Sequence, residues 1–215
     1  MKKITLLSLV AVLLTALTFT SCNTGDDNGY SLLTKEQQDA YQTKMAGSYP
    51  NLVLLFDHKN DANVKNQADS VETSCYFSMR NDSTFTISNF PIKKLAEHIS
   101  NPELKEAISK VEDNKTVTGK YMVLPNSKTN QAYFSACPSP ITLYLKYGSD
   151  AKEHKVVLIF SAYYAGGCIW ATKQIGFPFY LTYIFVDGAQ TNYIKNSINS
   201  QPIVSFACRN KVTSK

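Results

Sequence analysis

Residues 141–164 read ITLYLKYGSDAKEHKVVLIFSAYY. Apolar and polar side chains alternate over residues 141–147, which is the period of a strand with one buried face. Gly148 and Asp150 then favour a turn. Residues 156–164 are apolar on both faces of an extended chain, as in a central strand that is covered on each side. This stretch predicts two strands, with a turn at the end of the first.

Similar strand signals lie on both sides of this stretch. Turn residues separate them at intervals of roughly 8–15 residues, which is typical of antiparallel sandwiches and barrels. The composition agrees, because 44% of the residues are hydrophobic and 12% are aromatic. We expect a mainly β protein of the α+β type, built as an antiparallel sandwich or a barrel-like sheet. The further strands are expected at residues 52–56, 71–79, 83–88, 116–124, 179–186 and 203–208.

Helical signals occur in two places. Thr34 and Gln37 form a capping box, and they predict an N-terminal helix that ends at about Met45, before Gly47. Apolar residues at helical spacing predict a two-helix insertion at about residues 92–110. The two helices should be separated near Pro102, which fits the first position of the second helix.

The N-terminal sequence MKKITLLSLVAVLLTALTFTSC has the parts of a bacterial lipoprotein signal. Two lysines precede an apolar stretch that is shorter than the roughly 20 residues of a membrane-spanning helix. We expect residues 1–21 to be removed as a signal peptide and Cys22 to carry acyl chains that anchor the protein to a membrane. Residues 23–29 contain no apolar side chain, and we expect residues 22–33 to form a flexible tether. Residues 34–215 should form a single β-rich domain.

The formal net charge of +5 is small for a chain of 215 residues. It includes two lysines of the expected signal peptide, and the other basic residues are dispersed along the sequence. Nucleic-acid-binding domains instead gather basic residues on one face. We therefore expect no nucleic-acid partner.

Four cysteines follow Cys22 in the sequence: Cys75, Cys137, Cys168 and Cys208. In an oxidising compartment they could form two disulfides in three connectivities, and the sequence does not choose among these. Buried free thiols are the alternative. The cysteines have no C-x-x-C spacing and no accompanying histidine, so no metal site is expected.

No motif for a catalytic site or a cofactor occurs in the sequence. His58 beside Asp57 could be an acid–base pair, although adjacent polar residues at the start of a loop are usually solvated. The segment from Asp57 to Asp69 is rich in Asp and Asn but lacks the order of a calcium loop. We expect no cofactor and no metal.

Aromatic residues are concentrated near the C-terminal end of the strand-rich region. Such rings could stack on sugars, or they could belong to the core, which is the more common role of aromatics on two-faced strands. Trp170 and Tyr164 are expected to be the exposed members and the candidate ligand-binding residues. They flank Gly166-Gly167, which indicates a turn or bulge between strands. The group comprises Tyr163, Tyr164, Trp170, Phe177, Phe179, Tyr180 and Tyr183.

Several short motifs resemble those of exported Bacteroidota proteins. Ser21 before Cys22, with acidic residues a few positions later, is similar to the signal of surface-exposed Bacteroidota lipoproteins. Asp-Ser-Val at Ser70 and Asp-Ser-Thr at Ser83 resemble the O-glycosylation sequon of such proteins. Residues 82–87 and 90–108 resemble a family of Bacteroidota lipoproteins of unknown function. The family resemblance implies a cell-envelope location and a non-enzymatic default, and the resemblance of the signal implies an outer-membrane, surface-exposed position.

These observations favour a binding or interaction module at the outer membrane, for a glycan, a small ligand or an envelope partner. A hydrolase whose site is assembled from scattered residues is one alternative. A structural or adhesion component of the envelope is another. Fold class alone does not choose among these functions.

Overall fold

The computed structural model describes residues 32–58, 68–80, 82–112, 115–126, 128, 130–149, 151–189, 191–195 and 203–211. The expected signal peptide, Cys22 and most of the expected tether lie outside the described residues. So does most of the segment from Asp57 to Asp69. The side chains of Asp57 and His58 are also outside the description, and with them the candidate acid–base pair.

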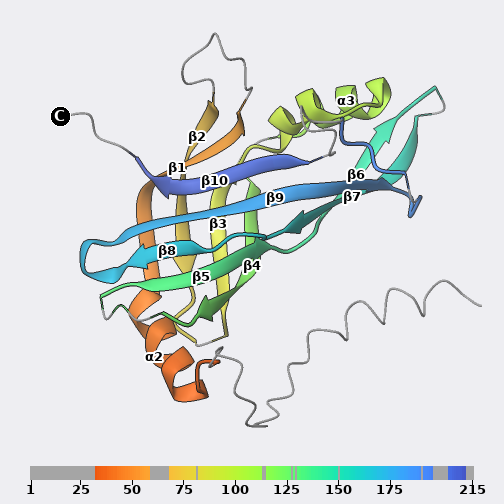
Figure 1. The fold of residues 1–215 in the computed structure, drawn as a ribbon. Coiled ribbons are helices and arrows are strands. Elements are labelled where there is room, and N and C mark those ends of the chain that lie inside the picture. The colour runs from red at the N-terminus through yellow and green to blue at the C-terminus, as the bar shows by residue number, and fades with distance from the viewer. Residues whose placement is uncertain are drawn as a thin grey trace, which may run out of the picture. The chain divides into compact units, whose positions relative to one another are not determined.

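The described residues form a closed antiparallel barrel of eight strands (Figure 1), which decides between the two predicted architectures. The wall runs in the order β10-β1-β2-β3-β4-β5-β8-β9, and β9 pairs with β10 to close it. The strands of the wall are β1 (Gly47–His58), β2 (Ala68–Phe77), β3 (Thr84–Phe90), β4 (Lys115–Leu124), β5 (Ala132–Pro138), β8 (Gly166–Ile169), β9 (Gln174–Val186) and β10 (Val204–Asn210).

Two more strands extend the sheet beyond the barrel. They are β6 (Ile141–Tyr147) and β7 (Lys152–Ser161), which pair with each other, and β7 also pairs with the C-terminal half of β9. β6 is therefore the terminal strand of this extension. Because β8 pairs with the N-terminal half of β9, β7 and β8 follow one another along the same edge of β9.

Aromatic rings fill the barrel interior. Phe77 is fully buried and contacts the rings of Tyr49, Phe85, Tyr121, Phe134 and Phe177, with centroid distances of 5.0–6.3 Å. A second group of rings continues this core toward β10 and contains Phe90, Phe160, Phe179 and Phe206. An eight-stranded barrel is just wide enough for side chains to fill it. The large aromatic content of the strands is thus explained by packing.

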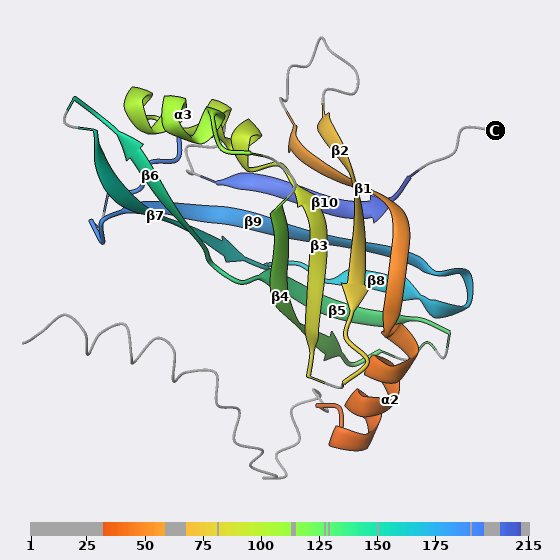
Figure 2. The ribbon, with the colours of Figure 1, turned by 180° about the vertical axis from the view of Figure 1, so that it is seen from behind.

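Three helices lie against the strands. α2 (Lys35–Met45) begins at the predicted capping box and stands at the end of the barrel where β1 begins (Figure 2). The predicted insertion is present as a 3₁₀ helix, η1 (Ile92–His98), followed by α3 (Pro102–Ser109), and α3 packs on β6. A single 3₁₀ turn, η2 (Trp170–Thr172), joins β8 to β9. No helix in the described part of the chain is long and apolar enough to cross a bilayer.

Several details differ from the predictions. β1 begins at Gly47, before Pro50, and accommodates a bulge at Asn51, whose φ of 59° is one that asparagine tolerates. β5 was not predicted, and Gly166-Gly167 lies in β8 instead of forming a turn. The prediction that residues 156–164 form a strand covered on both faces was also wrong. β7 ends at Ser161, and its outward residues Val157 and Ile159 are only partly buried.

Candidate functional site

The outer face of the β6–β7–β9 extension carries a group of exposed aromatic side chains, called here the tyrosine face. Its β9 residues lie on one side because the register between β7 and β9 shifts between Ile159 and Phe160, which offsets the odd spacing of Tyr180 and Tyr183. Phe185 pairs with Val157, Tyr183 with Ile159 and Tyr180 with Ser161, and residues opposite one another in an antiparallel pair point the same way. The tyrosine face consists of Tyr144 in β6, Tyr163 and Tyr164 after β7, and Tyr180, Tyr183 and Phe185 in β9.

Four of these rings are largely open to solvent. The exposed fraction is 63% for Tyr144, 63% for Tyr163, 66% for Tyr164 and 47% for Tyr183. Tyr180 is partly buried beneath the two exposed rings of the loop, at centroid distances of 5.3 Å from Tyr163 and 6.2 Å from Tyr164. The opposite face of the extension is buried in the core together with α3. The tyrosine face is thus the solvent side of a well-supported sheet.

An interruption of the sheet places Tyr163 and Tyr164 on this face. Ser161 pairs with Tyr180 and Gly167 pairs with Gly176, so residues 162–166 lie opposite only residues 177–179 of β9. The surplus residues leave the sheet as an outward loop, and this loop carries both tyrosines. Residues of such an irregular segment are commonly re-aimed toward solvent.

Gly166 returns the chain to the barrel wall after this loop. A Cβ atom at Gly166 would lie 2.4 Å from the Cβ of Phe177 and 2.6 Å from the carbonyl oxygen of Gly176, whereas a Cβ atom at Gly167 would meet nothing within 4 Å. Only the first of the two glycines is therefore required by close packing.

A polar clamp holds the far end of the tyrosine face. The carboxylate of Asp187 lies 2.7 Å from His154 Nδ1 and accepts a hydrogen bond of 2.8 Å from the backbone N–H of Lys155. The hydrogen bond to His154 and then that from Lys155 lower the pKa of Asp187. Since Lys155 pairs with Tyr144, this clamp fixes β7 between β6 and the end of β9.

Trp170 lies elsewhere, although the sequence placed it beside Tyr164 as an exposed ring. It is partly buried against α2, with its ring centroid 6.1 Å from that of Tyr41 and 4.9 Å from Lys44 Nζ. Trp170 therefore helps to dock α2. Phe177 and Phe179 of the same predicted group are buried in the core.

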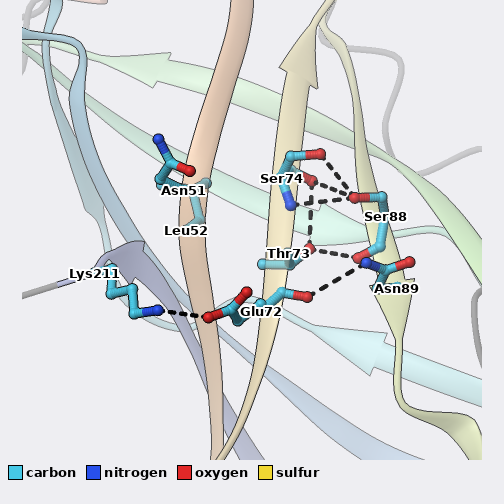
Figure 3. Close-up of a pocket in the computed structure, with 8 residues that line it drawn as sticks. All are labelled: Asn51, Leu52, Glu72, Thr73, Ser74, Ser88, Asn89 and Lys211. Atoms are coloured by element: carbon cyan, nitrogen blue, oxygen red, sulfur yellow. Dashed lines mark hydrogen bonds and ion pairs between the residues drawn. The ribbon is translucent and has the colours of Figure 1, made fainter.

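A second candidate site is a polar groove of about 240 Å³ on the outside of β1, β2 and β3 (Figure 3). Here β2 and β3 separate beyond the pair Cys75–Ile87, and side chains replace the missing backbone ladder. Ser74 N donates to Ser88 Oγ at 3.1 Å, Thr73 Oγ1 donates to Ser88 O, and Asn89 Nδ2 donates to Glu72 O at 3.5 Å. The groove is lined by Asn51, Leu52, Glu72, Thr73, Ser74, Ser88, Asn89 and Lys211.

Most polar groups of this groove bind one another. The hydroxyls of Ser74 and Ser88 are 2.7 Å apart, and Lys211 forms an ion pair with Glu72 at the rim. The arrangement explains how the barrel wall stays closed where the ladder is interrupted. A ligand would have to displace these internal bonds, so the groove fits a structural role better than a binding role.

The remaining predicted site residues are dispersed. Ser70 is exposed on β2, whereas Ser83 Oγ accepts a hydrogen bond of 2.7 Å from Gln42 Nε2. All four described cysteines are free thiols, and Cys75 and Cys208 are in contact. Among the described residues no group of three or more His, Cys, Asp or Glu side chains could hold a metal ion.

Comparison with known families gives one match. The profile of a domain of unknown function, DUF4840, covers residues 44–186. The chain belongs to the DUF4840 family. The matched region of this DUF4840 protein includes β1 to β9 and the whole tyrosine face, whereas β10, which closes the barrel, lies beyond it. No curated protein and no solved structure matches the chain.

The sequence indicated an aromatic concentration but not its division between core and surface. Alternation could have separated Phe177 and Phe179 from Tyr180, but it would have placed Tyr183 in the core, because the extra residue Thr182 in β9 has no signal in the sequence. Tyr144 was overlooked because it is far from the others in sequence. Only the β6–β7–β9 pairing brings it to the same face.

Proposed function

We propose that this DUF4840 protein is a non-catalytic binding module of the cell envelope, and that it binds a glycan on the tyrosine face. The observation that carries the proposal is the exposure of Tyr144, Tyr163, Tyr164 and Tyr183 on one sheet face. Burying a large ring normally stabilises a protein. Several tyrosines kept in water on one surface therefore suggest a surface selected for contact with something else.

Tyrosine suits a sugar because both partners are amphipathic. A pyranose ring has an apolar C–H face and a hydroxyl-bearing edge, and a tyrosine has an apolar ring and a polar tip. The backbone adds regular spacing, since neighbouring strands lie about 4.8 Å apart and alternate residues of one strand about 6.6 Å apart. An extended glycan could contact rings of β6, β9 and the loop after β7 along such a surface.

The packed interior favours an external ligand. The rings around Phe77 and Phe179 fill the described part of the barrel, and the pocket on β1–β3 is polar and internally bonded. In contrast, no hydrogen bond is described between the rings of the tyrosine face. A ligand could therefore bind there without displacing one. Its loop also offers adaptable contacts, because Tyr163 and Tyr164 lie outside the regular ladder.

The envelope location rests on the sequence. The N-terminal signal and Cys22 support a lipid anchor, and the motifs shared with Bacteroidota lipoproteins support an outer-membrane, surface-exposed position. A protein held there would meet polysaccharides continuously. Labelling cells with an alkyne fatty acid tests the anchor: label on the protein that disappears in Cys22→Ala supports it, and label that persists in this variant contradicts it.

A glycan array probed with the purified full-length protein tests the binding function. We expect wild-type protein to bind at least one glycan class and the Tyr163→Ala, Tyr164→Ala double variant to lose that signal. Tyr76→Ala is the matched control, because Tyr76 is an exposed tyrosine on β2, outside the tyrosine face. The absence of any glycan signal, or equal binding by the double variant, would exclude the proposed site. Hydrolysis of the bound glycan would show an enzyme instead of a binding module.

A further inference from the structure

Two buried cysteines from distant parts of the sequence meet inside the barrel. Cys75 lies in β2 and Cys208 in β10, 133 positions later, and their Sγ atoms are 3.5 Å apart. Both side chains are buried, with exposed fractions of 2% and 0%. β1 lies between the two strands in the sheet and pairs with both.

We propose that Cys75 and Cys208 are a modification site at which the mature protein forms an intramolecular disulfide. Each thiol loses its proton, a bond forms between the two sulfur atoms, and an electron pair passes to a disulfide oxidant. That oxidant, either oxidised glutathione or a protein dithiol–disulfide carrier, is reduced to two thiols. The inference does not depend on the proposed glycan binding.

The other two cysteines have different surroundings. The Cys168 sulfur lies 3.2 Å from the hydroxyl of Tyr49, and that hydroxyl donates to the carbonyl of Met45. Cys137 is partly buried at an outward position of β5, and its thiol donates to the carbonyl of Pro138 at 3.6 Å. Neither has another described cysteine sulfur in contact. The geometry therefore selects one of the possible pairings and leaves two thiols free.

The proposed bond would secure the closure of the barrel. β10 is the strand that joins β1 to β9, and it follows β9 only after a connection that includes residues outside the described part. A cross-link between β2 and β10 would hold this last strand in place. Because the linked residues are far apart in sequence, the bond would also restrict the unfolded chain strongly.

Burial sets the time at which the bond can form. The hydrogen bond with Cys75, together with burial, raises the pKa of Cys208 well above its usual range, so few thiolates exist in the folded protein. Oxidation should therefore occur during folding, while both thiols are still accessible. Once formed, the same burial protects the bond from soluble reductants.

The test is to refold reduced, full-length protein in a glutathione redox buffer, and then to denature it, block free thiols and map the peptides by mass spectrometry. We expect a Cys75–Cys208 peptide that is about 2 Da lighter than its two reduced parts, with Cys137 and Cys168 blocked. Blocking of Cys75 and Cys208 as free thiols, or a bond of either one to Cys137 or Cys168, would overturn the proposal.

Stability gives a second readout that does not depend on peptide recovery. Oxidised wild-type protein that is unfolded, reduced and refolded without an oxidant should have a midpoint of thermal unfolding about 10 °C lower. Cys137→Ser is the control and should show the same drop, because it leaves the proposed pair intact. Cys208→Ser should show no drop on reduction. A drop that persists in Cys208→Ser would assign the stabilising bond to other cysteines and contradict the proposal.

Discussion

Alanine at Gly166 and alanine at Gly167 should change the stability of the protein in opposite directions. The two glycines are neighbours in β8, and neither has a positive φ, so the backbone at both sites can accept alanine. They differ in what the added methyl group meets. At Gly166 it would lie 2.4 Å from the Cβ of Phe177 and 2.6 Å from the carbonyl oxygen of Gly176, and at Gly167 it would meet no atom within 4 Å.

These contacts set the expected magnitudes. Carbon atoms pack at about 3.5–4.0 Å, so β8 and β9 would have to separate by about 1 Å to admit Gly166→Ala. Overpacking of this kind costs about 1–3 kcal/mol. Gly167→Ala should instead stabilise the protein by about 0.4–1 kcal/mol, because alanine restricts the unfolded chain. The two variants should therefore differ by about 1.4–4 kcal/mol in free energy of unfolding.

Thermal and urea unfolding followed by circular dichroism measure this difference. For a domain of this size it corresponds to a gap of roughly 3–16 °C between the two melting midpoints, with Gly166→Ala below wild type. Equal stability of the two variants, or greater stability of Gly166→Ala, would refute the assigned packing of β8 against β9. Because the substitution is the same in both variants, differences in helix or strand propensity cannot account for the result.

Four other substitutions test the core, the surface and the start of one helix. Phe77→Ala should destabilise the protein by about 4 kcal/mol, because the ring is fully buried among five others. Tyr76→Ala, on the opposite face of β2, should change the stability by less than about 0.5 kcal/mol. Similar urea midpoints of the two variants would contradict the packed interior. Tyr121→Phe should raise the free energy of unfolding by about 1 kcal/mol, because the Tyr121 hydroxyl is buried without a hydrogen-bond partner in the described structure. Burial raises the pKa of Tyr121 to about 12, so the folded protein holds this proton more tightly than the unfolded chain. The free energy of unfolding should therefore fall as the pH rises from about 10 to 12. This fall should be less steep in Tyr121→Phe, which has no hydroxyl proton to lose. Parallel alkaline unfolding curves for wild type and Tyr121→Phe would count against this explanation. Asn101→Ala should cost about 1 kcal/mol, since Asn101 Oδ1 accepts a hydrogen bond from Leu104 N at the start of α3; an unchanged urea midpoint would show that this cap is unimportant.

Local patterns in the sequence predicted much of the fold. The alternation in residues 116–124 and 141–147 identified β4 and β6, and the capping box at Thr34 identified the start of α2. β8 was missed because a strand of four residues with two glycines has almost no strand signal. β5 was missed although its burial alternates, because small residues and a proline weaken its strand propensity.

The candidate sites depended on long-range contacts and were less predictable. Apolar residues on both faces of 156–161 suggested a covered strand, but periodicity does not reveal whether the second face has a partner. Here that face carries the exposed rings instead. The contact between Cys75 and Cys208 joins β2 and β10, which lie on the two sides of β1, and this strand order is not visible in the spacing of the cysteines.

The most direct test of glycan binding on the tyrosine face is isothermal titration of its best array ligand into three full-length proteins. These are wild type, Tyr164→Ala and Tyr76→Ala. Loss of one stacked ring, at about 1.4 kcal/mol, should weaken binding by about tenfold in Tyr164→Ala. The affinity of Tyr76→Ala should stay within about twofold of wild type. Equal affinities of wild type and Tyr164→Ala, or an equal loss in Tyr76→Ala, would contradict the assignment of the binding surface.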